Sequence, residues 1–228
     1  AISLAFAEAG ADLMLADLNE PGAQQTAADI EALGRRAIPV RCDVSDPEQI
    51  RPMFERLDAE LGRIDVLANI AGGSVTLKPP EQLDVDDVSR SIQSLVLGRF
   101  FCCQQAGHRM LAAGKGSIIN IVSVAGLTAM GRGHMAYSTA MGGVAQMTRE
   151  LSTEWASRGV RVNAIVLAQV MNPDLRQRID KDPRMEEQWL RGLAMGRLGE
   201  PDDVKGVAIF LAADAARWVT GIMLPMDG

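Results

Sequence analysis

The sequence predicts an α/β fold with a doubly wound parallel sheet in a single domain that spans residues 1–228. Short apolar runs rich in β-formers alternate with longer stretches of helical periodicity, which is typical of parallel βαβ units. A chain of 228 residues is long enough to bury one sizeable core. No linker, repeat or low-complexity tract interrupts the sequence, so we place no domain boundary.

The elements follow one another in a regular order along the chain. The predicted strands cover residues 12–16, 37–41, 66–69, 117–122, 161–166 and 223–225. The predicted helices cover residues 1–9, 23–33, 47–61, 85–112, 136–157 and 201–213. Gly10, Gly22 and Gly34 fall where turns or helix ends are expected.

The first helix begins at residue 1 without a capping side chain and leads directly into a strand. This order is expected of a doubly wound sheet that is entered after its first strand. Without a central strand, buried backbone groups on two sheet edges would lack partners, at a cost of about 1–3 kcal/mol each. We therefore expect a first strand and a glycine loop upstream of Ala1.

Composition excludes several classes of function. The formal net charge is −6, which provides no basic field for nucleic acid or an anionic membrane surface. No apolar run approaches the ~18 residues of a membrane span, and no basic segment of a signal peptide opens the chain. The three cysteines, two of them adjacent, are poorly spaced for disulfides. We expect a cytoplasmic protein with no nucleic-acid partner, no membrane partner and no metal site.

Three polar residues stand at predicted strand ends: Asp17, Asp43 and Asn69. Open α/β sheets bind ligands at this carboxyl edge. Asp17 lies where a dinucleotide fold places the acid that binds the ribose hydroxyls, and its carboxylate would repel a 2′-phosphate. Asp17 predicts NAD(H) in preference to NADP(H), although a cap or turn ahead of Pro21 and Gly22 explains it about equally well.

The stretch from Gly116 to Thr148 carries the strongest chemical signal. It runs from an apolar strand through a glycine-rich loop into a helix of small residues. Ser123 ends the strand and Tyr137 lies on the helix, which is the order and spacing of a hydroxyl pair that transfers protons.

Over nearly its whole length the chain resembles the short-chain dehydrogenases/reductases. The blocks that carry the resemblance are AFAEAGADLMLADLNE, CDVSD, LANIAG, GSIINIVSVAG, the Tyr137 helix, RVNAI, GRLGEPDDV and VTGIMLPMDG. The resemblance implies a Rossmann-type sheet, bound NAD(H) or NADP(H), carbonyl/alcohol redox chemistry and a homo-oligomer, either tetramer or dimer. It assigns Ser123 to the substrate carbonyl and Tyr137 to proton transfer.

The same resemblance assigns the cofactor contacts. These fall on Asp17, Asp43, Val44, Asn69, Ala71, Gly72, Tyr137 and Asn172. Asn172 takes the place of a threonine that bonds the nicotinamide carboxamide. Residues 172–198 are interpreted as an amphipathic lid over the substrate, although such an apolar stripe is as often simple packing.

The family pattern is broken on the nicotinamide side. The family lysine, four residues after the tyrosine, is Met141, the family asparagine is Leu95, and Leu167-Ala168 replaces Pro-Gly. A shift of one residue would place Ser94 at the asparagine position. By residue type alone, Met141 is most simply explained by packing. The stretch from Arg99 to Cys103 is interpreted as the buried face of a helix that lines a dimer contact in this family.

Proton transfer by a tyrosine at neutral pH needs a nearby cation, because an unperturbed phenol has a pKa near 10. The lysines of the chain are Lys78, Lys115, Lys181 and Lys205, and Val144 stands where the enoyl-reductase branch of the family keeps one. A protonated His134, one turn before Tyr137, is an alternative, and a partly exposed loop histidine is the more common explanation.

Two hypotheses follow. The first is an NAD(H)-linked oxidoreductase acting on an alcohol or ketone, slowed by about 10² to 10⁴ because its acid/base arrangement is incomplete. Its residual activity would favour carbonyl reduction. The second is a non-redox protein of the same fold, either a nucleotide-binding or regulatory subunit or an enzyme with a repurposed pocket. A module that binds no nucleotide is a third possibility if the chain starts at Ala1.

Overall fold

The computed structural model describes residues 1–72 and 75–228, and the predicted α/β fold with parallel strands is confirmed. The strands are β1 (Leu13–Asp17), β2 (Ala37–Arg41), β3 (Val66–Asn69), β4 (Gly116–Ser123), β5 (Val160–Leu167) and β6 (Met223–Met226). The longer helices are α1 (Ile2–Glu8), α2 (Glu20–Ala32), α3 (Pro47–Leu61), α4 (Val85–Ser91), α5 (Gly98–Ala113), α6 (Met135–Trp155), α7 (Pro173–Lys181), α8 (Arg184–Leu190) and α9 (Lys205–Ala212). These bounds differ from most predicted ones by only a few residues.

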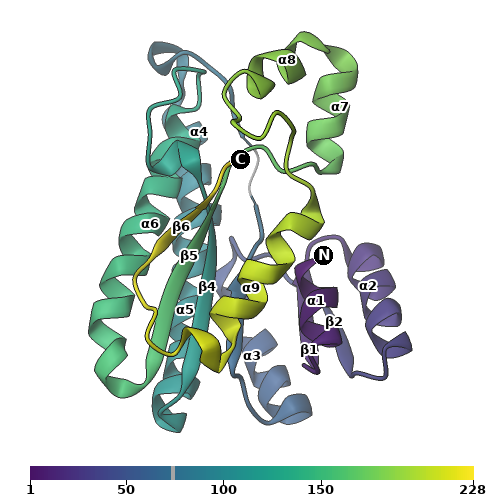
Figure 1. Cartoon of the computed structure of the whole chain (residues 1–228). Coiled ribbons are helices and arrows are strands. Elements are labelled where there is room, and N and C mark those ends of the chain that lie inside the picture. The colour runs from purple at the N-terminus through teal and green to yellow at the C-terminus, as the bar shows by residue number, and fades with distance from the viewer. Residues whose placement is uncertain (73–74) are drawn as a thin grey trace.

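The strands form two parallel sheets, β1-β2 and β3-β4-β5-β6. Among the described residues, β1 and β3 each pair with one strand only. α1 packs against both groups, since Ala7 is buried with α2 while Ile2 and Phe6 pack on the core beneath α9. Figure 1 shows α1, α2, β1 and β2 together beside α9.

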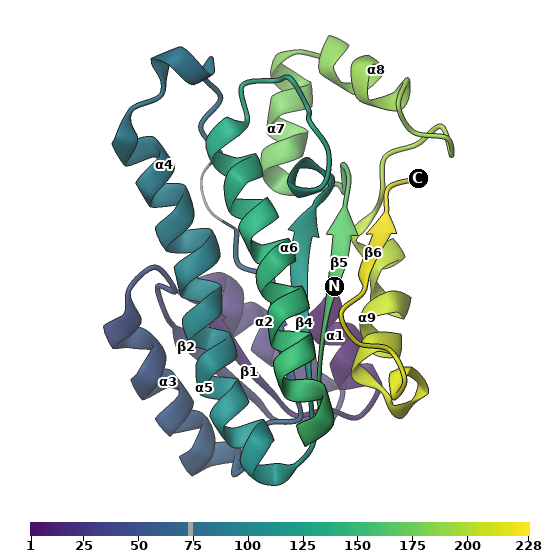
Figure 2. The same cartoon turned by 90° about the vertical axis from the view of Figure 1, so that its left-hand side faces the viewer.

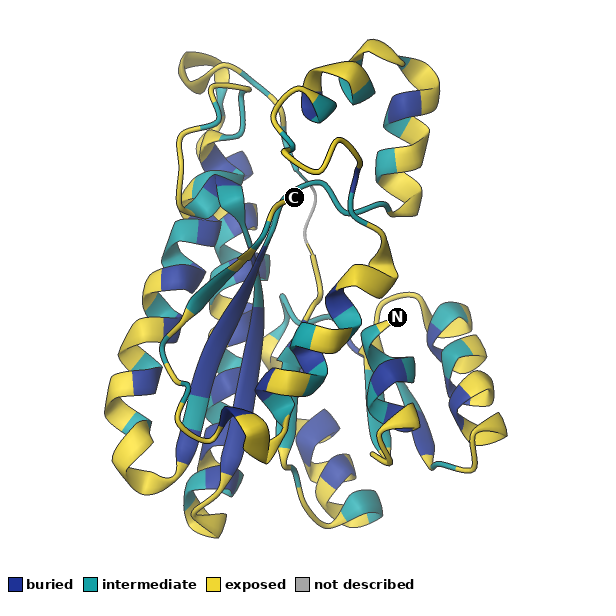
Figure 3. Cartoon of the chain, in the orientation of Figure 1, coloured by how far each residue is buried: buried dark blue, intermediate teal, exposed yellow. Residues whose placement is uncertain are grey.

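Helices cover both faces of the larger sheet. α5 and α6 run side by side over one face, as Figure 2 shows, and α9 covers the other. β4 and β5 are buried over most of their length (Figure 3) because they are the two central strands of the larger sheet and have helices on both sides.

The predicted helix over residues 85–112 is interrupted, which corrects the sequence prediction. α4 gives way at Ile92–Leu97 to a π-helical turn before α5 resumes. Apolar periodicity cannot reveal this because Leu95, inside the turn, is still fully buried in the core. The interruption changes the phase of the residues that follow, and one of those residues is Arg99.

Residues 172–198 contain α7 and α8, which lie beyond the carboxyl ends of β5 and β6 (Figure 1). Ile179, Trp189 and Leu198 are buried in a cluster of their own, joined by side chains such as Leu175 and Met185. The apolar stripe of this segment is therefore largely packing within the segment itself.

Candidate active site

The carboxyl ends of the strands place the predicted residues at one edge of the sheet. Ser123 is the last residue of β4, paired with Leu167 of β5, and Asn69 is the last residue of β3. Ser123 also caps the short 3-10 turn that follows, since its Oγ accepts a hydrogen bond of 3.2 Å from the backbone N–H of Ala125. Its hydroxyl hydrogen has no acceptor within the described part of the chain.

The loop after Ser123 is held against α6. A side chain at Gly126 would lie 2.6 Å from the backbone carbon of Met141, so the approach requires glycine. Tyr137, one turn earlier on α6, is partly buried against the core cluster that includes Leu95, Val122 and Met141. Its hydroxyl makes no hydrogen bond to any described residue. Ser123 and Tyr137 thus belong to two elements in direct contact.

The two departures from the family pattern are core residues. Leu95 and Met141 are 0% and 2% exposed and lie in the same cluster as Tyr137. Ser94 bonds the backbone carbonyl of Arg90 at 2.9 Å and is partly exposed, so the buried position opposite α6 is that of Leu95. The predicted packing role of Met141 is confirmed.

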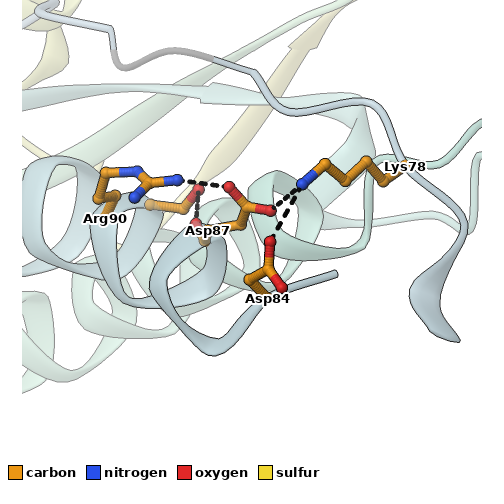
Figure 4. Close-up of polar contacts among 5 residues, drawn as sticks. Lys78, Asp84, Asp87 and Arg90 are labelled. Carbon is orange, nitrogen blue, oxygen red and sulfur yellow. Dashed lines mark hydrogen bonds and ion pairs between the residues drawn. The ribbon is translucent and has the colours of Figure 1, made fainter. Parts of the chain in front are cut away.

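The lysines that form ion pairs with carboxylates are not available as the cation beside Tyr137. Lys78 lies beside Gly133, yet its Nζ is 2.7 Å from Asp87 and 3.4 Å from Asp84 (Figure 4). Arg90 also pairs with Asp87. Lys115 pairs with Asp214 and Lys205 with Asp202, while Lys181 lies in the last turn of α7.

His134 does not supply the cation either. Its ring centroid is 6.5 Å from that of Tyr137. Burial, with smaller contributions from the charges of Arg132 and Arg178, lowers the pKa of His134 from its ordinary value, so the imidazole is neutral at pH 7. Its Nδ1 is buried without a hydrogen-bond partner among the described residues.

A buried guanidinium lies at the site, and the sequence did not predict it there. Arg99 of α5 is 4% exposed. Its Nη1 donates to the carbonyl of Ile121 at 2.7 Å and lies 3.9 Å from the Sδ of Met141, and its Nη2 donates to the carbonyl of Ala71 at 3.0 Å. The predicted buried face is confirmed for Arg99, Cys102 and Cys103, whereas Phe100 is exposed. In the sequence, the signal that could have pointed to Arg99 is a single arginine within an otherwise apolar run.

The predicted adenosine side is more open. Asp17 is exposed, and its Oδ1 accepts from the backbone N–H of Asn19 at 2.9 Å, while Asn19 itself caps α2. Asp17 is therefore a turn residue, but not the helix cap. Hydrogen bonds from Ser45 lower the pKa of Asp43, whose carboxylate stabilises the loop after β2. In that loop, the carbonyl of Val44 lies against Gly98.

The remaining residues predicted to contact the cofactor differ in their exposure and in whether their polar groups are already hydrogen-bonded. Asn69 is buried and donates to Asn120 at 2.9 Å and to the sulfur of Cys103 at 3.3 Å, so its amide hydrogens are used inside the core. Ala71 and Gly72 are exposed. Asn172 caps α7 by accepting from Leu175 at 2.9 Å and donates to the carbonyl of Val170.

Two cavities flank the sheet edge. One of about 250 Å³ lies between Ile2 of α1 and the strand residues Ile121 and Leu167, and another of about 230 Å³ lies between Val170 and Leu193. Ser123 and Tyr137 line neither. No cluster of three or more potential metal ligands and no helix suited to crossing a membrane occurs among the described residues.

Comparison with known proteins gives consistent matches over the full length. A sequence profile described as enoyl-(acyl carrier protein) reductase matches residues 1–228. D-threitol dehydrogenase of Mycolicibacterium smegmatis is 36% identical over 228 residues, which is 100% of this chain and 86% of that protein. Galactitol 2-dehydrogenase (L-tagatose-forming) of Cereibacter sphaeroides is 36% identical, with 100% and 88% covered.

Solved structures match equally well. NAD⁺-bound xylitol dehydrogenase superposes with a TM-score of 0.94 at 26% identity, covering 100% of this chain and 92% of that one. A gluconate 5-dehydrogenase from Burkholderia cenocepacia in complex with NADP and tartrate gives a TM-score of 0.92 at 30% identity, with 100% and 88% covered.

Proposed function

Because the chain belongs to the short-chain dehydrogenase/reductase family, we propose that it is an NAD(H)-linked oxidoreductase that interconverts an alcohol and a ketone. The observation that carries the proposal is the pairing of Ser123 and Tyr137. The loop that begins at Ser123 packs directly on the helix that carries Tyr137, and both hydroxyls lack an acceptor among the described residues. Free hydroxyl donors are what a substrate oxygen requires.

The two hydroxyls have separate tasks. The Ser123 hydroxyl holds the substrate oxygen, because its own oxygen is already fixed by the N–H of Ala125 and its hydrogen is left to donate. The Tyr137 hydroxyl gives a proton to the carbonyl oxygen in reduction and removes one from the alcohol in oxidation. The nicotinamide cofactor, when bound, supplies or accepts the hydride.

The residues present fit such a cofactor at the adenosine end. Asp17 offers an exposed carboxylate at the end of β1, which suits ribose hydroxyls and disfavours a 2′-phosphate. Val44, Ala71 and Gly72 are the further contacts we propose, with Asn172 for the carboxamide. We also infer a homo-oligomer and a substrate lid in residues 172–198 from the family.

We infer a polyhydroxylated or hydroxylated small molecule as substrate. The supporting observation is that relatives at 36% identity are named D-threitol dehydrogenase and galactitol 2-dehydrogenase. Leu95 has no group that could hold a relay water, so we expect turnover slower than in these relatives, by about 10²-fold or more.

A second candidate is a nucleotide-binding protein without redox activity. It is favoured by one observation, that Leu95 and Met141 are packed apolar residues where the family has polar ones. Binding of NADH without turnover of any polyol or ketone would support this candidate.

The test is the variant Tyr137→Phe, assayed with NAD⁺ and NADP⁺ on a panel of polyols and with NADH on the matching ketones. Turnover should fall by at least 10²-fold, because the ring remains and only the proton-transferring oxygen is removed. NADH affinity from fluorescence titration and the melting temperature should stay within error. Unchanged turnover in Tyr137→Phe would overturn the proposal.

A further inference from the structure

We propose that the Arg99 guanidinium replaces the absent lysine as the fixed positive charge beside Tyr137 and so stabilises the phenolate form of this residue. The proposal rests on the proposed function and deepens it. In this scheme the cation is carried by α5, and Met141 stands at the position of the family lysine on α6. Arg99 is a positioning residue in this scheme, because it acts through the tyrosine.

The geometry places the guanidinium next to Met141, the residue that stands at the family lysine position. Nη1 of Arg99 is 3.9 Å from the Sδ of Met141, the residue one helical turn after Tyr137. The same nitrogen is bonded to the carbonyl of Ile121, two residues before Ser123 on β4. Nη2 is bonded to Ala71 just beyond β3. The charge is thus fixed between the two strand ends and the helix that carries the phenol.

This guanidinium has no counter-ion in the described part of the chain. No Asp or Glu pairs with it, and its Nε is buried without a partner. A buried charge is costly unless it is paired, so a cation in this position calls for an anionic or electron-rich group.

Tyr137 is the acidic side chain that we expect to interact with the positive charge of Arg99. Burial lowers the pKa of Arg99, and the acidic side chains that oppose this shift are Tyr137, then Cys103 and Cys102. Burial also raises the pKa of Cys102 and of Cys103 to about 12, so both thiols are neutral near pH 7. The guanidinium itself stays protonated throughout the working range.

The other charged or titratable groups around the phenol do not compete. On the α6 side, His134 is uncharged at pH 7, and Arg132 and Arg178 are the charges that act on it. From the loop that precedes α4, Lys78 is held by Asp84 and Asp87 (Figure 4). Of these cations, Arg99 is the one that is buried and that has no carboxylate partner among the described residues.

The role differs between the two directions of the reaction. In oxidation the phenolate removes the alcohol proton while the hydride passes to the oxidised nicotinamide, and a neighbouring cation favours the charged form of the tyrosine. In reduction the neutral phenol donates its proton to the carbonyl oxygen as the hydride arrives. The guanidinium neither gains nor loses a proton. Loss of the positive charge should therefore impair oxidation more than reduction near neutral pH.

Tyr137 is the only tyrosine of the chain, so its ionisation can be measured directly from phenolate absorbance without cofactor or substrate. In Arg99→Gln, which keeps a donor for the carbonyls but removes the charge, the titration midpoint should move up by about one pH unit or more. Arg99→Lys should restore most of the difference. A midpoint that is the same in wild type, Arg99→Gln and Arg99→Lys would overturn the proposal.

Arg161 provides the matched control. It is also a partly buried arginine that bonds backbone carbonyls, those of Leu211 and Val219, but it lies near the amino end of β5. Arg161→Gln should lower the melting temperature without moving the tyrosine titration. An equal shift in Arg161→Gln would show that loosened packing, not charge, sets the midpoint.

Kinetics separate this proposal from the proposed function. In Arg99→Gln, kcat for alcohol oxidation at pH 7 should fall by at least tenfold, should recover at high pH and should be rescued in part by Arg99→Lys. If the wild type turns over no substrate, the proposed function fails, while the titration of the free protein still tests Arg99. Equal pH profiles for wild type and Arg99→Gln would count against the role of Arg99.

A charge-swap variant tests the proposal even if Arg99→Gln does not fold. Met141→Lys alone places an ammonium against the guanidinium, so it should lower the melting temperature and raise no activity. Arg99→Met with Met141→Lys places one cation on α6 and should restore both the melting temperature and the titration midpoint to those of the wild type. If Met141→Lys alone increases oxidation while Arg99 is present, the site lacked a cation and the proposal is wrong.

Discussion

Asp17 and Arg99 are the charged residues on which the proposed cofactor preference and the proposed role of a cation rest, and their surroundings differ. Asp17 is exposed at the end of β1 and keeps its carboxylate available to a ligand. Arg99 is buried, bonded to two carbonyls, and exerts its effect through electrostatics at short range. The first is recognisable from its position after a strand, whereas the second is recognisable only when its neighbours are known.

At the same scale, Asp17→Asn should weaken the proposed preference for NAD(H). Removing the carboxylate charge removes the repulsion of a 2′-phosphate, so the ratio of kcat/KM for NAD⁺ to that for NADP⁺ should fall by about tenfold or more. Asp12→Asn is the control, because Asp12 lies just before β1, at its other end, and pairs with Arg35. An unchanged cofactor ratio in Asp17→Asn would remove Asp17 from the proposed contacts.

At the scale of elements, the π-helical turn between α4 and α5 sets which residues face the site. Leu95 within the turn packs on α6, and Arg99 just after it reaches the carbonyls of β4 and of the segment after β3. Gly98 stands between them, and there the backbone of α5 meets the loop after β2. This close approach connects the predicted adenosine side, at Val44, to the side that carries Tyr137.

Gly98→Ala should therefore destabilise the protein. The added Cβ would lie 2.2 Å from the carbonyl oxygen of Val44, which is backbone and cannot rotate away. Overpacking of this kind costs about 1–3 kcal/mol, measurable by urea unfolding. Gly206→Ala in α9 is the opposite case, because nothing lies within 4 Å of its added Cβ and alanine favours the helix. Gly98→Ala with wild-type stability would contradict the observed contact.

At the scale of the whole molecule, the acidic side chains that stabilise loops and helix ends make folding sensitive to low pH. Hydrogen bonds and ion pairs lower the pKa of several aspartates, and for Asp203 to about 2. Asp203 accepts from Arg197 and from the backbone N–H of Glu200, so it joins Arg197, at the end of residues 172–198, to the 3-10 turn Pro201–Val204 that precedes α9.

The melting temperature should consequently fall as the pH is lowered from about 5 towards 2. A carboxyl with a lower pKa in the folded state stabilises that state above its unfolded pKa of about 3.9 and loses the contribution as it protonates. Asp203→Asn should lower the melting temperature at pH 7 and make little difference at pH 2. A melting temperature that is flat over this range would show that these pairs do not contribute.

The α/β class and the order of the elements could be predicted from the sequence by itself, because apolar periodicity and strand-end polar residues are local patterns. The sequence also predicts Ser123 and Tyr137 as a proton-transferring pair, and this stays a prediction. The role of Asp17 in the choice of cofactor stays a prediction as well. The departures at Leu95 and Met141 were also visible. Read along the chain, however, they indicated only that a polar group and a cation had been lost.

Only the tertiary structure decided where the positive charge of the site lies. Arg99 is 38 residues before Tyr137 in the numbering, and no spacing rule connects them. The π-helical turn, the packing of α5 against α6 and the carbonyls of Ile121 and Ala71 bring the guanidinium to Met141. The physical reason is that a buried charge acts across space on whichever group the fold places next to it.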